Sequence, residues 1–235
     1  MAINLPEKQL PNKPYTVEDM RKVCSILDTR DDRTRLATDE LEQAFAFIKS
    51  YPKSVSFFGS SHSKENDKYY ERARDIASRI VKELGYVVVT GAGPGIMEAA
   101  NRGAKEAGGR SIGFNIELPQ EQATNPYVTE SLSFHYFFTR KVSLSFSAEA
   151  YIFFPGGLGT MDELFELATL VQTHKIDPVP IILVGDGYWK ALESFMKEHM
   201  LEAGMIDEED LDIYTITDDE DEVISIVKSA PLRKE

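Results

Sequence analysis

Short apolar runs that each lead through small residues into a longer helical stretch recur along the chain from Ser54 onward. This alternation is typical of repeated βα units, whose strands form a parallel sheet. We predict six strands, at Val55–Phe58, Tyr86–Val89, Ser111–Phe114, Tyr151–Phe154, Ile181–Val184 and Ile213–Ile216. The expected fold class is α/β: a Rossmann-like, doubly wound, mostly parallel sheet with helices on both faces, including a last helix after Asp218.

The first 53 residues lack this alternation and are expected to be an N-terminal helical extension. Residues 1–15 carry three prolines among polar residues, which suits a loosely held arm. Helical spacing predicts two helices, roughly Val17–Leu27 and Arg33–Lys49, that pack against the core. Since 235 residues with 42% hydrophobic content suffice for one sizeable core, we expect residues 54–235 to form a single Rossmann-like domain behind this extension.

Charge and composition argue against several classes of partner. The net charge of −13 and a pI near 4.8 repel nucleic acid and anionic membranes. The apolar runs are too short to span a bilayer. The single Cys24 cannot form an internal disulfide, and the N-terminus lacks the features of a signal peptide. We therefore expect a cytoplasmic protein. We also expect no metal site, because the four histidines share no ligand spacing with Cys, Asp or Glu.

Three of the predicted strands end in turns built from small residues. The turns are Gly59-Ser60-Ser61, Gly91-Ala92-Gly93-Pro94-Gly95 and Pro155-Gly156-Gly157-Leu158-Gly159-Thr160. In a doubly wound sheet the first and fourth predicted strands are neighbours, so the first and third turns should flank one crevice. Glycine lets backbone N–H groups approach a ligand, and the following helix adds partial positive charge. The sequence therefore predicts a phosphate site, carried mainly by the third turn.

Other phosphate-binding motifs fit less well. The sequence lacks the Gly-x-x-x-x-Gly-Lys-Ser/Thr pattern of a P-loop. The second turn reads Gly-x-Gly-x-Gly, and Glu117 after the next predicted strand is the acid that an NAD(P) site would use for ribose. That alternative leaves the Gly156 turn unexplained. An isolated glycine turn is also often only a tight corner between strand and helix.

The residues of these turns, taken with two others, resemble a known family. Gly91-Ala-Gly-Pro-Gly-Ile-Met-Glu-Ala-Ala-Asn-Arg-Gly103, the pair Arg140-Lys141 and Pro155-Gly-Gly-Leu-Gly-Thr-Met-Asp-Glu163 look like the Lonely guy family of cytokinin-activating phosphoribohydrolases. The family's Pro-Gly-Gly-x-Gly-Thr-x-x-Glu motif is met at every fixed position. Members are often labelled lysine decarboxylases, but nothing here identifies a lysine that would carry pyridoxal phosphate. No cofactor is expected.

The chain departs from the family pattern in three places. Phe137-Phe138-Thr139 precedes the Arg-Lys pair where plant-like members have Met-His. The Gly91–Gly95 turn stands where many members have three consecutive glycines. Residues 1–53 precede the matched segment, as in the longer bacterial branch. The first two departures touch groups that could face the base, so the cytokinin substrate itself stays open.

The resemblance implies hydrolysis of a nucleoside 5′-monophosphate, of the AMP or cytokinin riboside monophosphate type, to free base and ribose 5-phosphate. Catalytic roles fall on Glu163 and Arg140. Substrate-binding roles are predicted for Ser60, Gly91, Gly93, Gly95, Met97, Glu121, Lys141, Gly156, Gly157, Leu158, Gly159, Thr160, Met161 and Asp162. A homodimer or higher homo-oligomer is usual for the family, and the aromatic Phe134–Phe146 stretch would suit its interface.

The residue types support these roles. Cleavage of an N-glycosidic bond passes through an oxocarbenium-like ribose, which a carboxylate such as Glu163 stabilises while it orients or deprotonates water. Arg140 lies in a stretch expected to be a mostly buried helix, where a guanidinium can grip phosphate or stabilise the departing base. Each residue also has a purely structural explanation. Glu163 could be an acid in the first turn that complements the helix dipole, and Arg140 could form a buried salt bridge with a carboxylate.

A rival reading is a binding protein of the same fold. Molybdenum-cofactor carriers resemble this family and hold a nucleotide-like cofactor without turnover. The presence of both Arg140 and Glu163 favours the enzyme, because carriage requires no carboxylate at the ribose. The third reading, an NAD(P)-dependent enzyme, would make Glu117 important.

Acidic runs at Asp207–Asp212 and Asp218–Glu222 are interpreted as a solvated face or helix starts.

Overall fold

The computed structural model, which describes residues 30–117 and 124–233, confirms the Rossmann-like α/β class. Seven strands form one sheet in the order β4-β3-β2-β1-β5-β6-β7, and every neighbouring pair is parallel. The strands are β1 (Ser54–Phe58), β2 (Val87–Thr90), β3 (Ser111–Ile116), β4 (Glu130–Phe134), β5 (Ala150–Phe153), β6 (Ile181–Leu183) and β7 (Tyr214–Ile216). The winding reverses between β1 and β5, as predicted.

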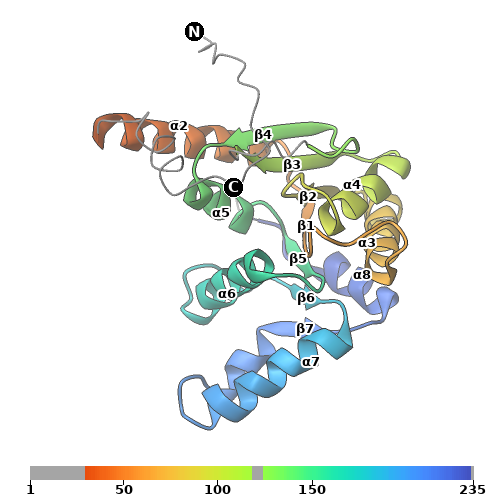
Figure 1. Ribbon diagram of the computed structural model, residues 1–235, viewed down its shortest axis with the longest axis vertical. Coiled ribbons are helices and arrows are strands. Elements are labelled where there is room, and N and C mark those ends of the chain that lie inside the picture. Colours follow the sequence, from red (N-terminus) through yellow and green to blue (C-terminus); the bar gives the residue numbers. More distant parts are fainter. Residues whose placement is uncertain (1–29, 118–123, 234–235) are drawn as a thin grey trace, which may run out of the picture.

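Helices cover both faces of the sheet (Figure 1). One face carries α3 (Lys68–Arg79) with its continuation η1 (Ile80–Leu84), α4 (Ile96–Glu106) and α8 (Glu220–Ser229). The other face carries α2 (Arg30–Lys49), α5 (Phe137–Ser145), α6 (Leu158–Gln172) and α7 (Asp186–Phe195). The segments η2 (Met196–Leu201) and η3 (Glu208–Asp212) lie between α7 and β7 in the chain. Two hydrophobic cores result, one on each side of the sheet.

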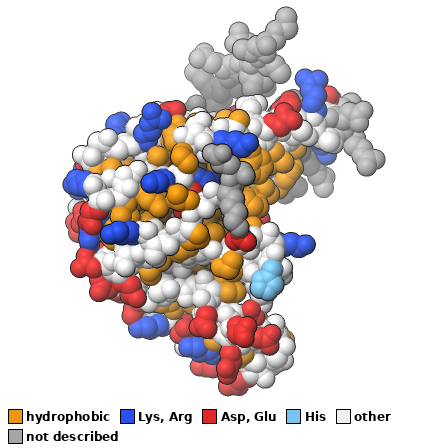
Figure 2. All heavy atoms as spheres, turned by 180° about the vertical axis from the view of Figure 1, so that it is seen from behind, with side chains coloured by type: hydrophobic (Ala, Val, Ile, Leu, Met, Phe, Trp, Pro, Cys, Tyr) orange, Lys and Arg blue, Asp and Glu red, His pale blue; other side chains and the backbone are white. Residues whose placement is uncertain are grey.

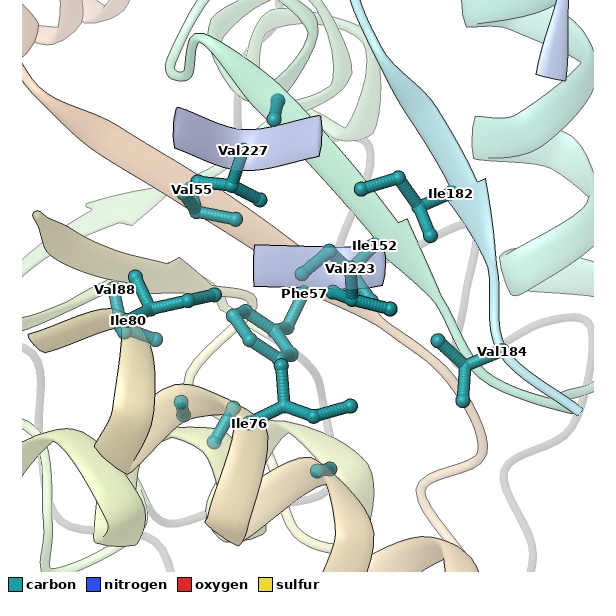
Figure 3. Packing of buried hydrophobic residues seen from close by; sticks show 14 of the residues in the cluster. Val55, Phe57, Ile76, Ile80, Val88, Ile152, Ile182, Val184, Val223 and Val227 are labelled. Atoms are coloured by element: carbon teal, nitrogen blue, oxygen red, sulfur yellow. The ribbon is translucent and has the colours of Figure 1, made fainter. Parts of the chain in front are cut away.

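The alternation of side chains along β1 assigns them to these two cores. Val55 and Phe57 are fully buried against Ile76, Ile80, Val223 and Val227 (Figure 3), whereas Phe58 packs on the opposite face. Successive residues of a strand point to opposite faces, so a strand covered on both sides must be apolar throughout. Each fully buried side chain of this size stabilises the fold by roughly 1.5–3 kcal/mol. This central position explains why β1 could be predicted from the sequence as a strand.

All six predicted strands are confirmed to within two residues, and the seventh, β4, was missed. β4 reads Glu-Ser-Leu-Ser-Phe, and only Phe134 at its end is buried. It is an edge strand, paired on one side by β3 alone, so it does not need an apolar run. The predicted helix Arg33–Lys49 is confirmed as α2, while the arm at 1–15 and the predicted helix Val17–Leu27 lie outside the described residues.

The prediction that the helix around Arg140 buries its apolar residues is largely wrong. The helix forms as α5, but Phe137 and Phe138 are 58% and 55% exposed, and Phe146 beyond its end is exposed too. Its buried residues are Leu144 and the small polar Thr139, Ser143 and Ser145. The periodicity therefore identified a helix without identifying its buried face.

Two surface properties follow from the fold. Within residues 30–117 and 124–233, no helix has the length and apolarity needed to cross a membrane. Acidic side chains gather over the lower part of the molecule in Figure 2, the end that α7 and β7 build in Figure 1. Glu208, Glu209 and Asp212 of η3 are exposed, as expected for a solvated acidic face.

Candidate functional site

The third glycine turn connects β5 to α6 as predicted. Gly157 precedes the first residue of α6, and Gly157, Leu158 and Gly159 are exposed. No side chain of the described residues caps this helix. Unpaired N–H groups and the helix dipole make such an N-terminus favourable for an anion. The open space around Gly157 and Gly159 leaves backbone free to approach a ligand.

Gly156 is needed because the turns approach closely at this point. A Cβ on Gly156 would lie 2.1 Å from Oγ1 of Thr160 and 3.0 Å from the backbone nitrogen of Ser60. The carbonyl of Gly156 accepts a hydrogen bond of 2.6 Å from the Tyr188 hydroxyl on α7. Any residue larger than glycine would therefore displace Thr160 and the Ser60 backbone from their positions beside residue 156.

Ser60 joins the three turns through its backbone. Its N–H donates to the carbonyl of Pro155 at 3.0 Å, and its carbonyl accepts from the N–H of Ile96 at 3.0 Å. Gly95 has a φ of +71°, and a Cβ there would lie 2.2 Å from the Ser60 carbonyl oxygen. The first and third turns are neighbours, as predicted, and the second turn meets them as well.

The second glycine turn rests on a buried amide network that the sequence analysis missed. Nδ2 of Asn125 lies 3.1 Å from the carbonyl of Ala92 and 3.0 Å from that of Gly93. Asn101 links Asn125 to the hydroxyl of Thr90. The network holds Ala92 in the left-handed region, at a φ of 63°, which is unfavourable for a residue with a Cβ. The turn therefore has a fixed shape.

Arg140 reaches from α5 to the carboxyl ends of two strands. Its Nε donates to the carbonyl of Phe114 at 2.7 Å, and one terminal nitrogen donates to the carbonyl of Gly91 at 3.4 Å. A Cβ on Gly91 would lie 2.2 Å from that nitrogen and 2.9 Å from Sδ of Met97. Burial lowers the pKa of the guanidinium, and the charge of Glu163 partly offsets this effect. A guanidinium stays protonated at neutral pH even so.

Glu163 projects from α6 and is 7% exposed. Its Oε2 has no hydrogen-bond partner among the described residues. Burial raises the pKa of this carboxyl to about 7, although Arg140 and Lys141 lower it, while Glu166 and Asp162 raise it further. Because α6 begins at Leu158, Glu163 lies beyond the first turn, where an acid no longer serves the helix dipole. A buried carboxyl with a raised pKa is a recognised feature of catalytic sites.

Lys141 lies beside the same helix, where it forms ion pairs. Its ammonium is 2.7 Å from Asp162 and 3.3 Å from Glu166, which flank Glu163 in the sequence. Burial lowers the pKa of Lys141 less than these carboxylates raise it, so the net shift is upward. With Phe165, these three residues line an open depression of about 360 Å³. Lys141 thus contacts acids on α6, and its substrate-binding role stays a prediction.

The remaining predicted residues differ in placement. Met161 is partly buried, whereas Leu158 is 90% exposed. Gly93 is buried, and its carbonyl contacts Asn125. Glu121 lies outside the described residues. Asn125 and Tyr188 carried no motif signal, since an Asn-Pro pair and an aromatic residue in a helix predict only a turn and a core position.

Comparison with known proteins identifies the family. The family described as "possible lysine decarboxylase" matches residues 97–227, more than half of the chain. The cytokinin riboside 5′-monophosphate phosphoribohydrolase LOG5 of Arabidopsis thaliana is 29% identical over 150 residues, which are 63% of this chain and 66% of that protein. The cytokinin riboside 5′-monophosphate phosphoribohydrolase of Rhodococcoides fascians is 28% identical over 159 residues, covering 66% of this chain and 79% of that protein.

Solved structures agree with the fold. The structural-genomics target TM1055 superimposes with a TM-score of 0.56 at 26% identity, covering 75% of this chain and 98% of its own. The molybdenum cofactor binding protein of Rippkaea orientalis gives a TM-score of 0.55 at 20% identity, covering 75% and 96%. The second likeness concerns the fold alone. From the matched segment and these relatives, the chain belongs to the "possible lysine decarboxylase" family, which includes the Lonely guy phosphoribohydrolases.

Proposed function

We propose that this chain hydrolyses the N-glycosidic bond of a nucleoside 5′-monophosphate. The bond between C1′ and the base nitrogen breaks with its electron pair leaving on the base, and a water oxygen bonds to C1′. The proton of that water passes to Glu163 and from there to the departing base. The products are free base and ribose 5-phosphate.

The observation that carries this proposal is the buried carboxyl of Glu163 one turn beyond the glycine turn, whose Oε2 has no hydrogen-bond partner in the part of the chain that the structure describes. A pKa of about 7 suits a group that takes a proton from water and returns it to a leaving group near neutral pH. Its negative form would also stabilise positive charge that develops on the ribose. A phosphate held at the N-terminus of α6 would bring the sugar towards this carboxyl.

Arg140 supplies the complementary positive charge. Its two hydrogen bonds to strand carbonyls use two of the five N–H donors of a guanidinium, which leaves others for a ligand. These donors would bind phosphate or stabilise electron density on the departing base. The two roles differ in their kinetic effect, because phosphate binding changes KM whereas leaving-group stabilisation changes kcat.

The names of the relatives support the reaction class and suggest the substrates to test. Both are named for cytokinin riboside 5′-monophosphate, which carries a modified adenine. We propose AMP or such an N-modified adenylate as the substrate. The shape of the region that binds the base would determine which of the two is preferred.

Pyridoxal phosphate, which the label "possible lysine decarboxylase" would imply, does not fit the lysine beside Arg140. A Schiff base requires a neutral amine, whereas Lys141 is paired with two carboxylates and its pKa is raised. A carrier of a nucleotide-like cofactor remains the rival function. The likeness to the Rippkaea orientalis protein supports it at the level of fold only.

The test incubates purified protein with a panel of nucleoside monophosphates and measures released ribose 5-phosphate. We expect one adenylate to be hydrolysed, Glu163→Gln to lower kcat by at least about 100-fold, and Arg140→Lys to lower kcat/KM by at least about 100-fold. If ligand binding is measurable but no monophosphate is cleaved, the carrier is favoured. If Glu163→Gln matches the unmodified protein, the catalytic proposal fails.

We also propose that the chain forms a homodimer or higher homo-oligomer. Phe137 and Phe138 expose more than half of their surface, and Phe146 follows them on the same side of the sheet. Exposed aromatic side chains are enriched at protein interfaces. Light scattering coupled to size exclusion should give a mass of at least two chains, and Phe138→Asp should reduce it.

A further inference from the structure

The helix that carries Arg140 is held at its N-terminal end by a residue from a distant part of the chain. The residue before α5, Tyr136, makes no side-chain capping bond, and the first turn of α5 contains no acid. The carboxylate of Glu40 on α2 binds beside this end of the helix. Its Oε1 accepts from the backbone N–H of His135 at 2.5 Å, and its Oε2 accepts from the hydroxyl of Thr139 at 2.5 Å.

Glu40 is suited to this contact by its burial and charge. It is 8% exposed, whereas Asp32, Asp39 and Glu42 of the same helix are exposed. Burying a carboxylate is costly unless strong hydrogen bonds and nearby positive charge compensate. The N-terminus of α5 offers partial positive charge, and the two hydrogen bonds use both carboxylate oxygens. The arrangement is therefore specific.

A second contact holds the other end of α5 against the same helix. The rings of Phe45 on α2 and Phe146, just beyond α5, have centroids 6.1 Å apart. α2 lies above α5 in Figure 1, and the two helices are in contact. Since α2 lies outside the segment 97–227 that matches the family, the helix carrying Arg140 is fixed by a part of the chain that the match does not include.

Resting on the function proposed above, we propose that Glu40 is a positioning residue for Arg140 and that α2 acts as a brace of the active site. Thr139, which Glu40 binds, is the residue directly before Arg140. The guanidinium bridges from α5 to carbonyls on two strand ends, so a small shift of α5 would break these bonds. A misplacement of about 1 Å in such a group can reduce the rate about 100-fold.

The first measurement reads the position of Arg140 without turnover. Phenylglyoxal labels accessible arginines, and mass spectrometry reports the labelling rate of Arg140 alone. We expect Glu40→Gln to raise that rate severalfold and to speed hydrogen exchange across α5. The matched control is Glu42→Gln, an exposed acid on the same helix, which should change neither. If Glu40→Gln also leaves both unchanged, the positioning role is overturned whether or not the protein hydrolyses nucleotides.

The second measurement links position to chemistry by a double-mutant cycle. We expect Glu40→Gln to lower kcat/KM about 10- to 100-fold in the otherwise unmodified protein and to have little further effect in the Arg140→Lys background. Equal effects in both backgrounds would overturn action through Arg140. If Glu40→Gln folds poorly, the same labelling and kinetic measurements are made on Thr139→Val, which removes the hydroxyl that donates to Glu40. Increased labelling of Arg140 in a protein without activity would refute the hydrolase while leaving the brace intact.

Discussion

Replacing Glu163 by glutamine should stabilise the folded protein at alkaline pH while it removes the proposed activity. Burial raises the pKa of this carboxyl from its ordinary 4.5 to about 7. The folded chain therefore binds the proton more tightly than the unfolded chain does. The stability contributed by the protonated carboxyl is fully present below about pH 4.5 and is lost as pH rises to about 7.

The size of this effect follows from linkage. A tenfold change in proton affinity is worth about 1.4 kcal/mol, so the shift corresponds to about 3 kcal/mol, of which about 2.5 kcal/mol falls between pH 5 and pH 8. Glutamine has nearly the same shape and does not titrate. The free energy of unfolding of Glu163→Gln, relative to that of the unmodified protein, should thus rise by about 2.5 kcal/mol between these two pH values.

Urea unfolding at several pH values measures this difference. Contributions of all other titrating groups cancel, because both proteins share them. Glu42→Gln removes an exposed carboxylate instead and serves as the matched control. A difference that stays constant within about 0.5 kcal/mol from pH 5 to pH 8, or that changes with the opposite sign, would refute the buried, proton-binding state of Glu163.

Three further changes probe the surroundings of the site. Gly91→Ala should cut kcat/KM by at least about tenfold with little loss of stability, because its Cβ would displace the flexible end of Arg140, 2.2 Å away. Lys141→Met should raise the pKa of the candidate catalytic carboxyl, because the ammonium lowers it, and move the acidic limb of the pH–kcat/KM profile to higher pH. Arg233→Met should cost about 3 kcal/mol in urea unfolding, because it leaves the fully buried Glu149 without its guanidinium partner.

Each of these three predictions has a result that would contradict it. Gly187→Ala, where a Cβ meets nothing within 4 Å, is the control for Gly91→Ala, and equal kinetics in the two variants would contradict displacement of Arg140. An unchanged or downward-shifted pH profile for Lys141→Met would show that its ammonium does not act on the carboxyl. A loss below about 1 kcal/mol for Arg233→Met would mean that Glu149 is satisfied by Ser54 alone.

The sequence predicted the parts of the fold that depend on local patterns. The central strands are covered on both faces, so their apolar runs are continuous, and the glycine turns follow from the backbone space they require. β4 escaped because an edge strand can be polar on most of its surface. The buried face of α5 was misjudged because phenylalanines usually lie inside, whereas Phe137 and Phe138 are exposed.

The supporting residues of the candidate site could not be predicted for a different reason. Glu40 contacts residues 95 and 99 positions further along the chain, and Asn125 reaches back 33 positions to Ala92. No periodicity or motif connects partners at such separations. The motif placed Glu163 beside the glycine turn, but its burial and raised pKa depend on how α5 and α6 pack.

The backbone contacts of Ser60 imply that the proposed phosphate end of the site is shaped before a ligand binds. Its N–H and carbonyl join the neighbouring turns whatever the side chain is, so little chain entropy remains to be lost when an anion binds. A preorganised cradle of this kind does not distinguish a substrate phosphate from a product phosphate. Ribose 5-phosphate, the sugar product of the proposed hydrolysis, should therefore compete with the nucleotide for this site.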